Sequence, residues 1–109
     1  MSDLTVANTI LKQMGGTGRL VAMIGANSFL GTDNEVTFRW KCKAKNGANT
    51  LRVTLLPNDT YEMNFGRIRS GRFKLVARLK PVYAEDLIRR FEETTGLYLR
   101  AIPVSRVNQ

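Results

Sequence analysis

Histidine is absent from the 109-residue chain, and cysteine occurs only once, as Cys42. Without an imidazole the chain has no Ser-His or Cys-His dyad, and it lacks the commonest metal ligand in proteins. One cysteine cannot close an intramolecular disulfide, which fits a reducing compartment, and so few ligands argue against a structural zinc site. These absences predict a protein that is not an enzyme and holds no metal or cofactor.

Long apolar runs are also missing. No run approaches the ~18 apolar residues of a membrane-spanning helix. The N-terminal sequence MSDLTVANT has an acid where a secretory signal has cations, so we expect a cytoplasmic protein without a membrane contact. Because 43 % of the residues are apolar, the chain is expected to fold as one compact domain over 1–109, with frayed ends at 1–3 and 104–109.

Acidic residues are scarce in one region of the chain. The net charge is +8. Residues 39–80 hold eleven of the 17 Lys and Arg but only two of the nine Asp and Glu. The rest of the chain holds six basic and seven acidic residues. The basic character is therefore a regional feature, which solubility alone does not require.

Residue spacing predicts the main elements. Apolar residues recur at helical spacing in DLTVANTILKQMGG (3–16) and in VYAEDLIRRFEETTG (82–96), and each segment ends in glycine. Between them, RLVAMIGA (19–26) predicts a short strand and NSFLGTDN (27–34) a loop. Apolar and polar residues alternate over 36–43, and three of the four polar ones are basic, which predicts a half-buried strand.

The dipeptide Asn46-Gly47 is the strongest hairpin signal in the chain. It predicts a two-residue turn with positive φ. That turn places Phe38 opposite Leu55, so apolar side chains meet, and it places Lys41 opposite Arg52. The second of these contacts is a like-charge pair, which costs stability.

Two further turns extend the hairpin series. Residues 57–59, Pro-Asn-Asp, predict a turn that places Phe65 opposite Leu51. After the third turn, Ser70-Gly71, a β-bulge at Gly66-Arg67 is needed to place Phe65 opposite Leu75 and not opposite Val76. The predicted fold is α+β, with about five antiparallel strands in mostly meander order and an N-terminal and a C-terminal helix packed on one face.

The basic residues are predicted to line the solvent face of this sheet and one hairpin tip. Their one-sided sign favours an anionic partner, above all the phosphate backbone of nucleic acid. An acidic protein surface is the alternative, and protection of edge strands and solubility is the third interpretation. The expected binding residues are Arg39, Lys41, Lys43, Lys45, Arg52, Arg67, Arg69, Arg72, Lys74 and Arg78.

The aromatic residues are predicted to lie on the opposite, helix-facing side, which leaves none for base stacking on the basic face. Binding is therefore expected to consist of phosphate contacts, with weak sequence preference and steep salt dependence. Cys42 is expected to be a buried, unreactive thiol, and Tyr83 a core aromatic. The aromatic side chains assigned to the apolar face are Phe38, Trp40, Tyr61, Phe65 and Phe73.

Four segments, TILKQMGG, MIGANSF, LRVTLLPNDTYEMNFGRIR and VYAEDLIRRFEETTGLY, resemble a group of small proteins encoded by phages, prophages and plasmids. The shared pattern consists of turn and core residues over roughly residues 8 to 98, so it carries over no site residues. The resemblance implies the cytoplasm of a bacterial host cell. It also implies an alternative function, a phage-encoded inhibitor of a host defence complex (anti-CRISPR-like) that acts by protein–protein contact.

The expected partners are therefore nucleic acid, a host nucleoprotein or an acidic protein. An exposed edge strand would also allow a homodimer, because its unpaired backbone groups can continue the sheet across a two-fold axis.

Overall fold

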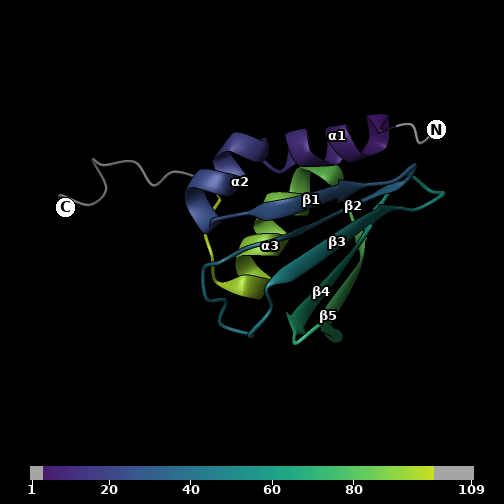
Figure 1. Ribbon diagram of the computed structural model, residues 1–109. Coiled ribbons are helices and arrows are strands. Elements are labelled where there is room, and N and C mark those ends of the chain that lie inside the picture. The colour runs from purple at the N-terminus through teal and green to yellow at the C-terminus, as the bar shows by residue number, and fades with distance from the viewer. Residues whose placement is uncertain (1–3, 100–109) are drawn as a thin grey trace, which may run out of the picture.

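The computed structural model describes residues 4–99. Five antiparallel strands form one open sheet in which each strand pairs with its neighbours in the sequence (Figure 1). This confirms the predicted α+β meander, with helices before and after the strands. The elements are α1 (Thr5–Gln13), α2 (Thr17–Ile24), β1 (Asn27–Gly31), β2 (Glu35–Arg39), β3 (Thr50–Leu55), β4 (Tyr61–Arg69), β5 (Arg72–Val82), a 3₁₀ turn (Ala84–Asp86) and α3 (Leu87–Thr95).

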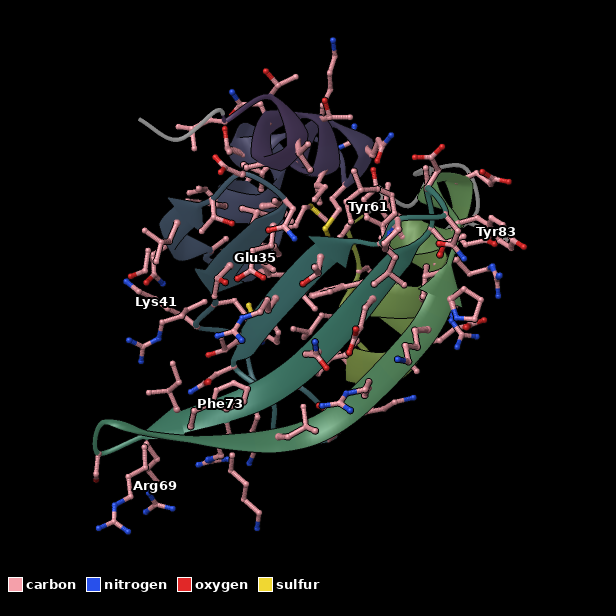
Figure 2. The ribbon with its side chains drawn as sticks, turned by 90° about the vertical axis from the view of Figure 1, so that its right-hand side faces the viewer. Glu35, Lys41, Tyr61, Arg69, Phe73 and Tyr83 are labelled. Atoms are coloured by element: carbon pink, nitrogen blue, oxygen red, sulfur yellow. The ribbon has the colours of Figure 1, made fainter. Side chains whose placement is uncertain are left out.

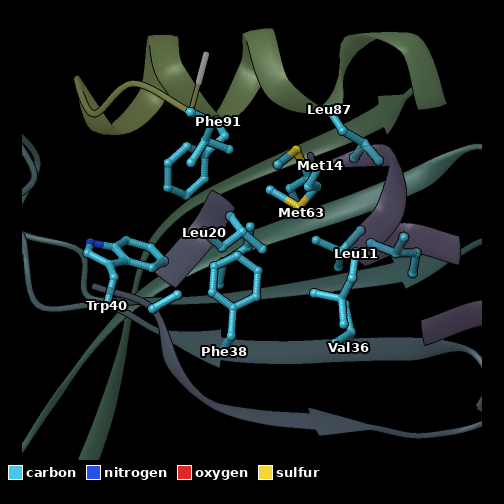
Figure 3. Packing of buried hydrophobic residues seen from close by; sticks show 14 of the residues in the cluster. Leu11, Met14, Leu20, Val36, Phe38, Trp40, Met63, Leu87 and Phe91 are labelled. Atoms are coloured by element: carbon cyan, nitrogen blue, oxygen red, sulfur yellow. The ribbon is translucent and has the colours of Figure 1, made fainter. Parts of the chain in front are cut away.

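The helices cover one face of the sheet, here called the inner face, and α1 contacts β2 while α3 contacts β5. Apolar side chains of the three helices meet those of the strands in one cluster (Figure 3). In its middle, the Phe91 ring of α3 stands edge-on to Trp40, with the ring centroids 5.3 Å apart, and lies 6.0 Å from Phe65. These contacts fix α3 against the sheet.

The segment 17–24 is a helix, so the strand predicted for 19–26 is wrong. Leu20 and Ile24, one helical turn apart, are buried in the core. A strand would also place these two side chains on one face, so this short window does not separate the two periods. The loop predicted for 27–34 is also wrong in part, because 27–31 form the edge strand β1.

The register of β2 with β3 differs from the prediction by four residues, because Phe38 pairs with Leu51 and not with Leu55. An even shift keeps every side chain on its face, so the apolar pattern fits both registers. The chain leaves the sheet after Trp40, since the N–H groups of Lys41 and Cys42 both donate to the Ile24 carbonyl, at 3.1 and 3.2 Å. Residues 40–49 therefore form a long connection, here called the β2–β3 loop, and the expected Lys41–Arg52 pair does not form.

The register of β3 with β4 is as predicted, with Phe65 opposite Leu51. Between β4 and β5 a β-bulge is present beside Gly66, but the extra residue is Val76 on β5 and not Gly66-Arg67 on β4. Leu75 consequently pairs with Gly66, and Phe65 pairs with Ala77. Because a slip of one residue moves side chains to the other face, Phe73 and Leu75 lie on the outer face, away from the helices.

Tyr61, Tyr83 and Cys42 were each expected to be buried, and only Tyr61 is. Tyr61 is buried as expected, and its hydroxyl donates to Gln13 Oε1 at 2.9 Å. Burial raises the pKa of Tyr61. Tyr83 is 55 % exposed and Cys42 is also exposed, so neither is the core residue that was predicted.

The expected fraying of 1–3 and 104–109 lies outside the described residues. Strands β1 and β5 are the two edges of the sheet, so dimerisation through an edge strand stays a prediction. In the described part of the chain the longest helices have nine residues, far fewer than a helix needs to cross a membrane.

The contrast between Phe91 and Tyr83 gives a test of the core. Phe91→Ala should lower the free energy of unfolding by about 3–5 kcal/mol, because it leaves a cavity between Trp40 and Phe65. Tyr83→Ala should cost less than about 0.5 kcal/mol, because more than half of that side chain is exposed. Urea denaturation of both variants measures the difference, and equal costs would contradict this packing.

Candidate nucleic-acid interface

The middle of the outer face carries charges of both signs. Arg52 Nε lies 3.5 Å from a carboxylate oxygen of Glu35. Arg78 Nε lies 3.2 Å from Glu62, and it also donates to Asn64 Oδ1 at 2.9 Å. The centre of the outer face is therefore not basic throughout, because Arg52 and Arg78 each have a carboxylate beside them. Arg39 is exposed at the end of β2 on the same face.

The remaining predicted cations gather at one end of the sheet, on two segments that are far apart in the sequence. All seven are exposed, and within residues 4–99 none of them has a carboxylate within ion-pair distance. Figure 2 shows Arg69 projecting from the end of the β4–β5 hairpin. This group, here called the basic end, comprises Lys41, Lys43 and Lys45 of the β2–β3 loop and Arg67, Arg69, Arg72 and Lys74 of the hairpin.

The hairpin places its cations directly opposite each other. Arg67 pairs with Lys74 and Arg69 with Arg72, in two cross-strand pairs that share one side of the hairpin and are separated by the Ile68–Phe73 pair on the other side. They continue the inner side of β4 beyond the helices, whereas the sequence analysis had placed Lys74 on the outer side. Like charges at opposed positions destabilise a hairpin by roughly 0.2–1 kcal/mol per pair. The like-charge contact expected at Lys41 and Arg52 is thus absent, but two others exist nearby.

The β2–β3 loop is held to three elements. The Lys45 N–H donates to the Thr95 carbonyl at the end of α3, at 2.8 Å. The Asn49 side chain exchanges two hydrogen bonds with the backbone of Ile68, at 3.0 and 2.8 Å. Arg67 Nη1 donates to the Gly47 carbonyl at 3.3 Å, which joins the loop to the hairpin. Together with the Ile24 contacts, these bonds present the lysines from a fixed backbone.

A partly open cleft of about 270 Å³ lies where the loop meets β4. Lys41, Lys43 and Arg67 contribute its cations, and among the described residues that line it none is acidic. No group of three His, Cys, Asp or Glu residues within 4–99 is arranged to hold a metal ion. The chemistry that this cleft offers is therefore the binding of an anion.

Phe73 lies on the outer face of the same hairpin, although the sequence had predicted it on the helix-facing side (Figure 2). Phe73 is 48 % exposed, and Leu75 and Val76, which follow it in the same strand, are 43 % and 37 % exposed. A Cβ atom at Gly66 would stand 2.2 Å from two carbons of the ring. Gly66 is therefore required by the close approach of Phe73, and the extra residue of the bulge is Val76 on the neighbouring strand.

No protein-family model, curated protein or solved structure matches this chain. The charges and geometry of the chain itself are therefore what bears on its function.

The contact between Gly66 and Phe73 predicts strong coupling. Gly66→Ala should lower the free energy of unfolding by about 1–3 kcal/mol, because the added methyl group overlaps the ring. In a Phe73→Ala background the same change should cost at least about 1 kcal/mol less. Urea denaturation of the four proteins measures this cycle, and additive effects would refute the contact. Gly18→Ala is the matched control, since its added methyl group meets nothing within 4 Å.

Proposed function

We propose that the protein binds nucleic acid through the basic end, by contacts between its cations and the phosphate backbone. The observation that carries this proposal is the pair of opposed like charges, Arg67–Lys74 and Arg69–Arg72. Four cations in two cross-strand pairs cost the free protein stability, and no carboxylate of the described residues offsets them. A polyanion removes that repulsion, so the arrangement favours the bound state.

The paired arginines on the outer face contribute less to this interface. Arg52 and Arg78 already have Glu35 and Glu62 as neighbours, so a phosphate has to compete with a carboxylate there. The proposed surface is thus narrower than the whole sheet face: it consists of the hairpin end and the lysines of the β2–β3 loop. Phe73 lies on the other side of the hairpin from the opposed cations, so phosphate contact and not base stacking is the expected mode.

The salt dependence of binding measures how many cations contact phosphates. If all seven cations of the basic end contact a duplex, log K should fall with log salt with a slope of roughly −6. Arg69→Gln combined with Arg72→Gln should make this slope shallower by about two and weaken binding to all sequences alike. Fluorescence anisotropy with labelled duplex and single-stranded oligonucleotides between ~50 and ~200 mM salt gives both values.

The control is Arg52→Gln combined with Arg78→Gln, which removes the same charge from the outer face. This control should leave the slope nearly unchanged but lower stability, because it breaks two ion pairs. The Arg69/Arg72 variant should be as stable as the natural chain or more stable, because one like-charge pair is relieved. Equal losses of affinity in both variants would place the interface on the sheet face, and no binding at low salt would exclude the proposed function.

A second candidate function is inhibition of a host defence complex by protein–protein contact. The observation that favours it is the apolar patch formed by Phe73 and Leu75 on the outer face and by the exposed bulge residue Val76 next to Leu75 in the sequence. The outer face also carries Arg39 and Arg78. Phe and Arg are enriched in protein interfaces, and apolar residues at their centre supply most of the binding energy. This patch lies on the opposite side of the hairpin from the opposed cations, so the two functions are separable by mutation.

Leu75→Thr combined with Val76→Thr tests the second candidate, since threonine is a β-branched residue that suits a strand and reduces the apolar surface. If the protein protects phages in bacteria that carry a CRISPR–Cas system, these changes should abolish the protection and leave nucleic-acid affinity unaltered. The measurement is phage plating efficiency with and without expression of each variant. Protection that survives the threonine changes and is lost in the Arg69/Arg72 variant would reject the patch as the interface.

A further inference from the structure

Trp40 contains an unsatisfied donor inside the protein. Its side chain is 4 % exposed, and Nε1 is the buried side-chain nitrogen or oxygen within residues 4–99 that has no hydrogen-bond partner. An indole N–H can only donate, and leaving a buried donor unpaired costs roughly 1–3 kcal/mol. Native proteins keep few such groups, and a ligand that supplies the missing acceptor is one explanation for them.

The orientation of the indole is fixed by the core. Phe38 and Phe91 hold the ring from two directions, with centroids 6.0 and 5.3 Å from that of Trp40. Figure 3 shows the nitrogen at the end of the ring that points away from Phe38. Trp40 is also one of the residues that line the cleft between the β2–β3 loop and β4. The residue that contains the buried donor is therefore also part of the wall of the cleft.

The other donors at this place are cationic. Lys43 and Arg67 line the cleft, and Arg67 is oriented by its bond to the Gly47 carbonyl, which uses one of its five N–H groups. A guanidinium fork and an ammonium group suit the oxygens of a phosphate, and charge-assisted bonds of this kind are roughly twice as strong as neutral ones. At about 270 Å³ the cleft has the size for a phosphate with little attached, since pockets for whole small molecules begin near ~300 Å³.

We propose that this cleft is a binding site for one phosphate group, with Trp40 Nε1 donating to an oxygen and Lys43 and Arg67 neutralising the charge. The nitrogen is covered in this structure, so the oxygen reaches it only when part of that cover moves aside. The inference rests on the proposed function for its biological source, a phosphate of a nucleic-acid backbone. The same chemistry would accept a free phosphate ion or the phosphate of a nucleotide.

Trp40 is the single tryptophan of the chain, so its emission reports on the site directly. Inorganic phosphate is titrated into the full chain at pH 7.5, with sodium chloride adjusted to hold the ionic strength constant. The expected result is a saturable change in emission with a dissociation constant on the order of 1 mM or tighter. Acetate and chloride at the same ionic strength should give no saturable change, and an equal response to acetate would refute a phosphate site.

Single substitutions show which residues bind the phosphate that changes the Trp40 emission. Lys43→Gln and Arg67→Gln should each weaken phosphate binding by roughly tenfold or more, since each removes a charge-assisted bond. Lys80→Gln is the matched control, because it removes an exposed cation of β5 that does not line the cleft, and it should change the affinity less than about twofold. If Lys43→Gln and Arg67→Gln leave the affinity unchanged, the assignment of the cleft is wrong.

The role of the indole donor has to be measured without fluorescence, because a substitution of Trp40 removes the only tryptophan of the chain. Trp40→Phe keeps an aromatic ring in the core and removes the N–H, and circular dichroism shows whether it folds. Phosphate binding by calorimetry should be weaker by roughly tenfold or more in a folded Trp40→Phe protein. An unchanged affinity in that folded variant would show that Trp40 does not bind the phosphate. If Trp40→Phe does not fold, the affinities of the Lys43 and Arg67 variants test whether the cleft is the phosphate site.

A competition experiment separates this inference from the proposed function. A single-stranded oligonucleotide is added to the phosphate-saturated protein while Trp40 emission and oligonucleotide anisotropy are recorded together. Displacement of phosphate by the oligonucleotide supports both the proposed function and the phosphate site in the cleft. Saturable phosphate binding without any oligonucleotide binding supports the cleft and assigns it to free phosphate or a nucleotide, against the proposed function. Oligonucleotide binding in a protein that gives no phosphate response supports the proposed function alone and overturns the inference.

Discussion

The packing of Trp40 between Phe38 and Phe91 is the interaction on which the rest of the structure depends. It attaches α3 to the sheet and it marks the point where β2 ends. The side chain remains in the core, while the backbone immediately after it turns toward the end of α2. One residue thus belongs both to the hydrophobic core and to the base of the loop that carries three lysines. Loss of this packing would release helix, loop and cleft together.

The β-bulge at Val76 has a comparable influence on the surface. Because it shifts β5 by one residue against β4, it decides which side chains of the hairpin share a face. With the bulge on this strand, the cations lie opposite cations, and Phe73 covers Gly66 on the other side. The hairpin end therefore has one basic side and one apolar side, although the sequence there simply alternates charged and apolar residues.

Several parts of the fold could be predicted from the sequence because local signals were sufficient. Glycines after amphipathic segments marked the ends of α1 and α3, and a short turn fixed the register of β3 with β4. The register of β2 with β3 could not be predicted, since two pairings four residues apart bury the same side chains. What separated them was a tertiary contact, the bonds from Lys41 and Cys42 to the Ile24 carbonyl, which has no local signature.

The candidate site was predictable in composition but not in arrangement. The excess of Lys and Arg over 39–80 correctly selected the exposed cations, but carboxylates from β2 and β4 lie beside two of them. Which acid meets Arg52 depends on the register of β2 with β3, and that register differs from the prediction by four residues. The pairing of a bulged strand is decided by packing on both faces, so the side on which the extra residue stands is poorly specified by sequence alone.

The opposed cations of the hairpin also have a consequence for how dissolved ions act on this protein. Added salt shortens the Debye length to about 10 Å at 0.1 M and so weakens the repulsion between Arg69 and Arg72 in the free chain. The same ions compete with the chain for phosphates. Higher ionic strength therefore stabilises the free protein and weakens its complexes with polyanions. The salt concentration that stabilises the free chain most is also the one at which its affinity for a polyanion is lowest.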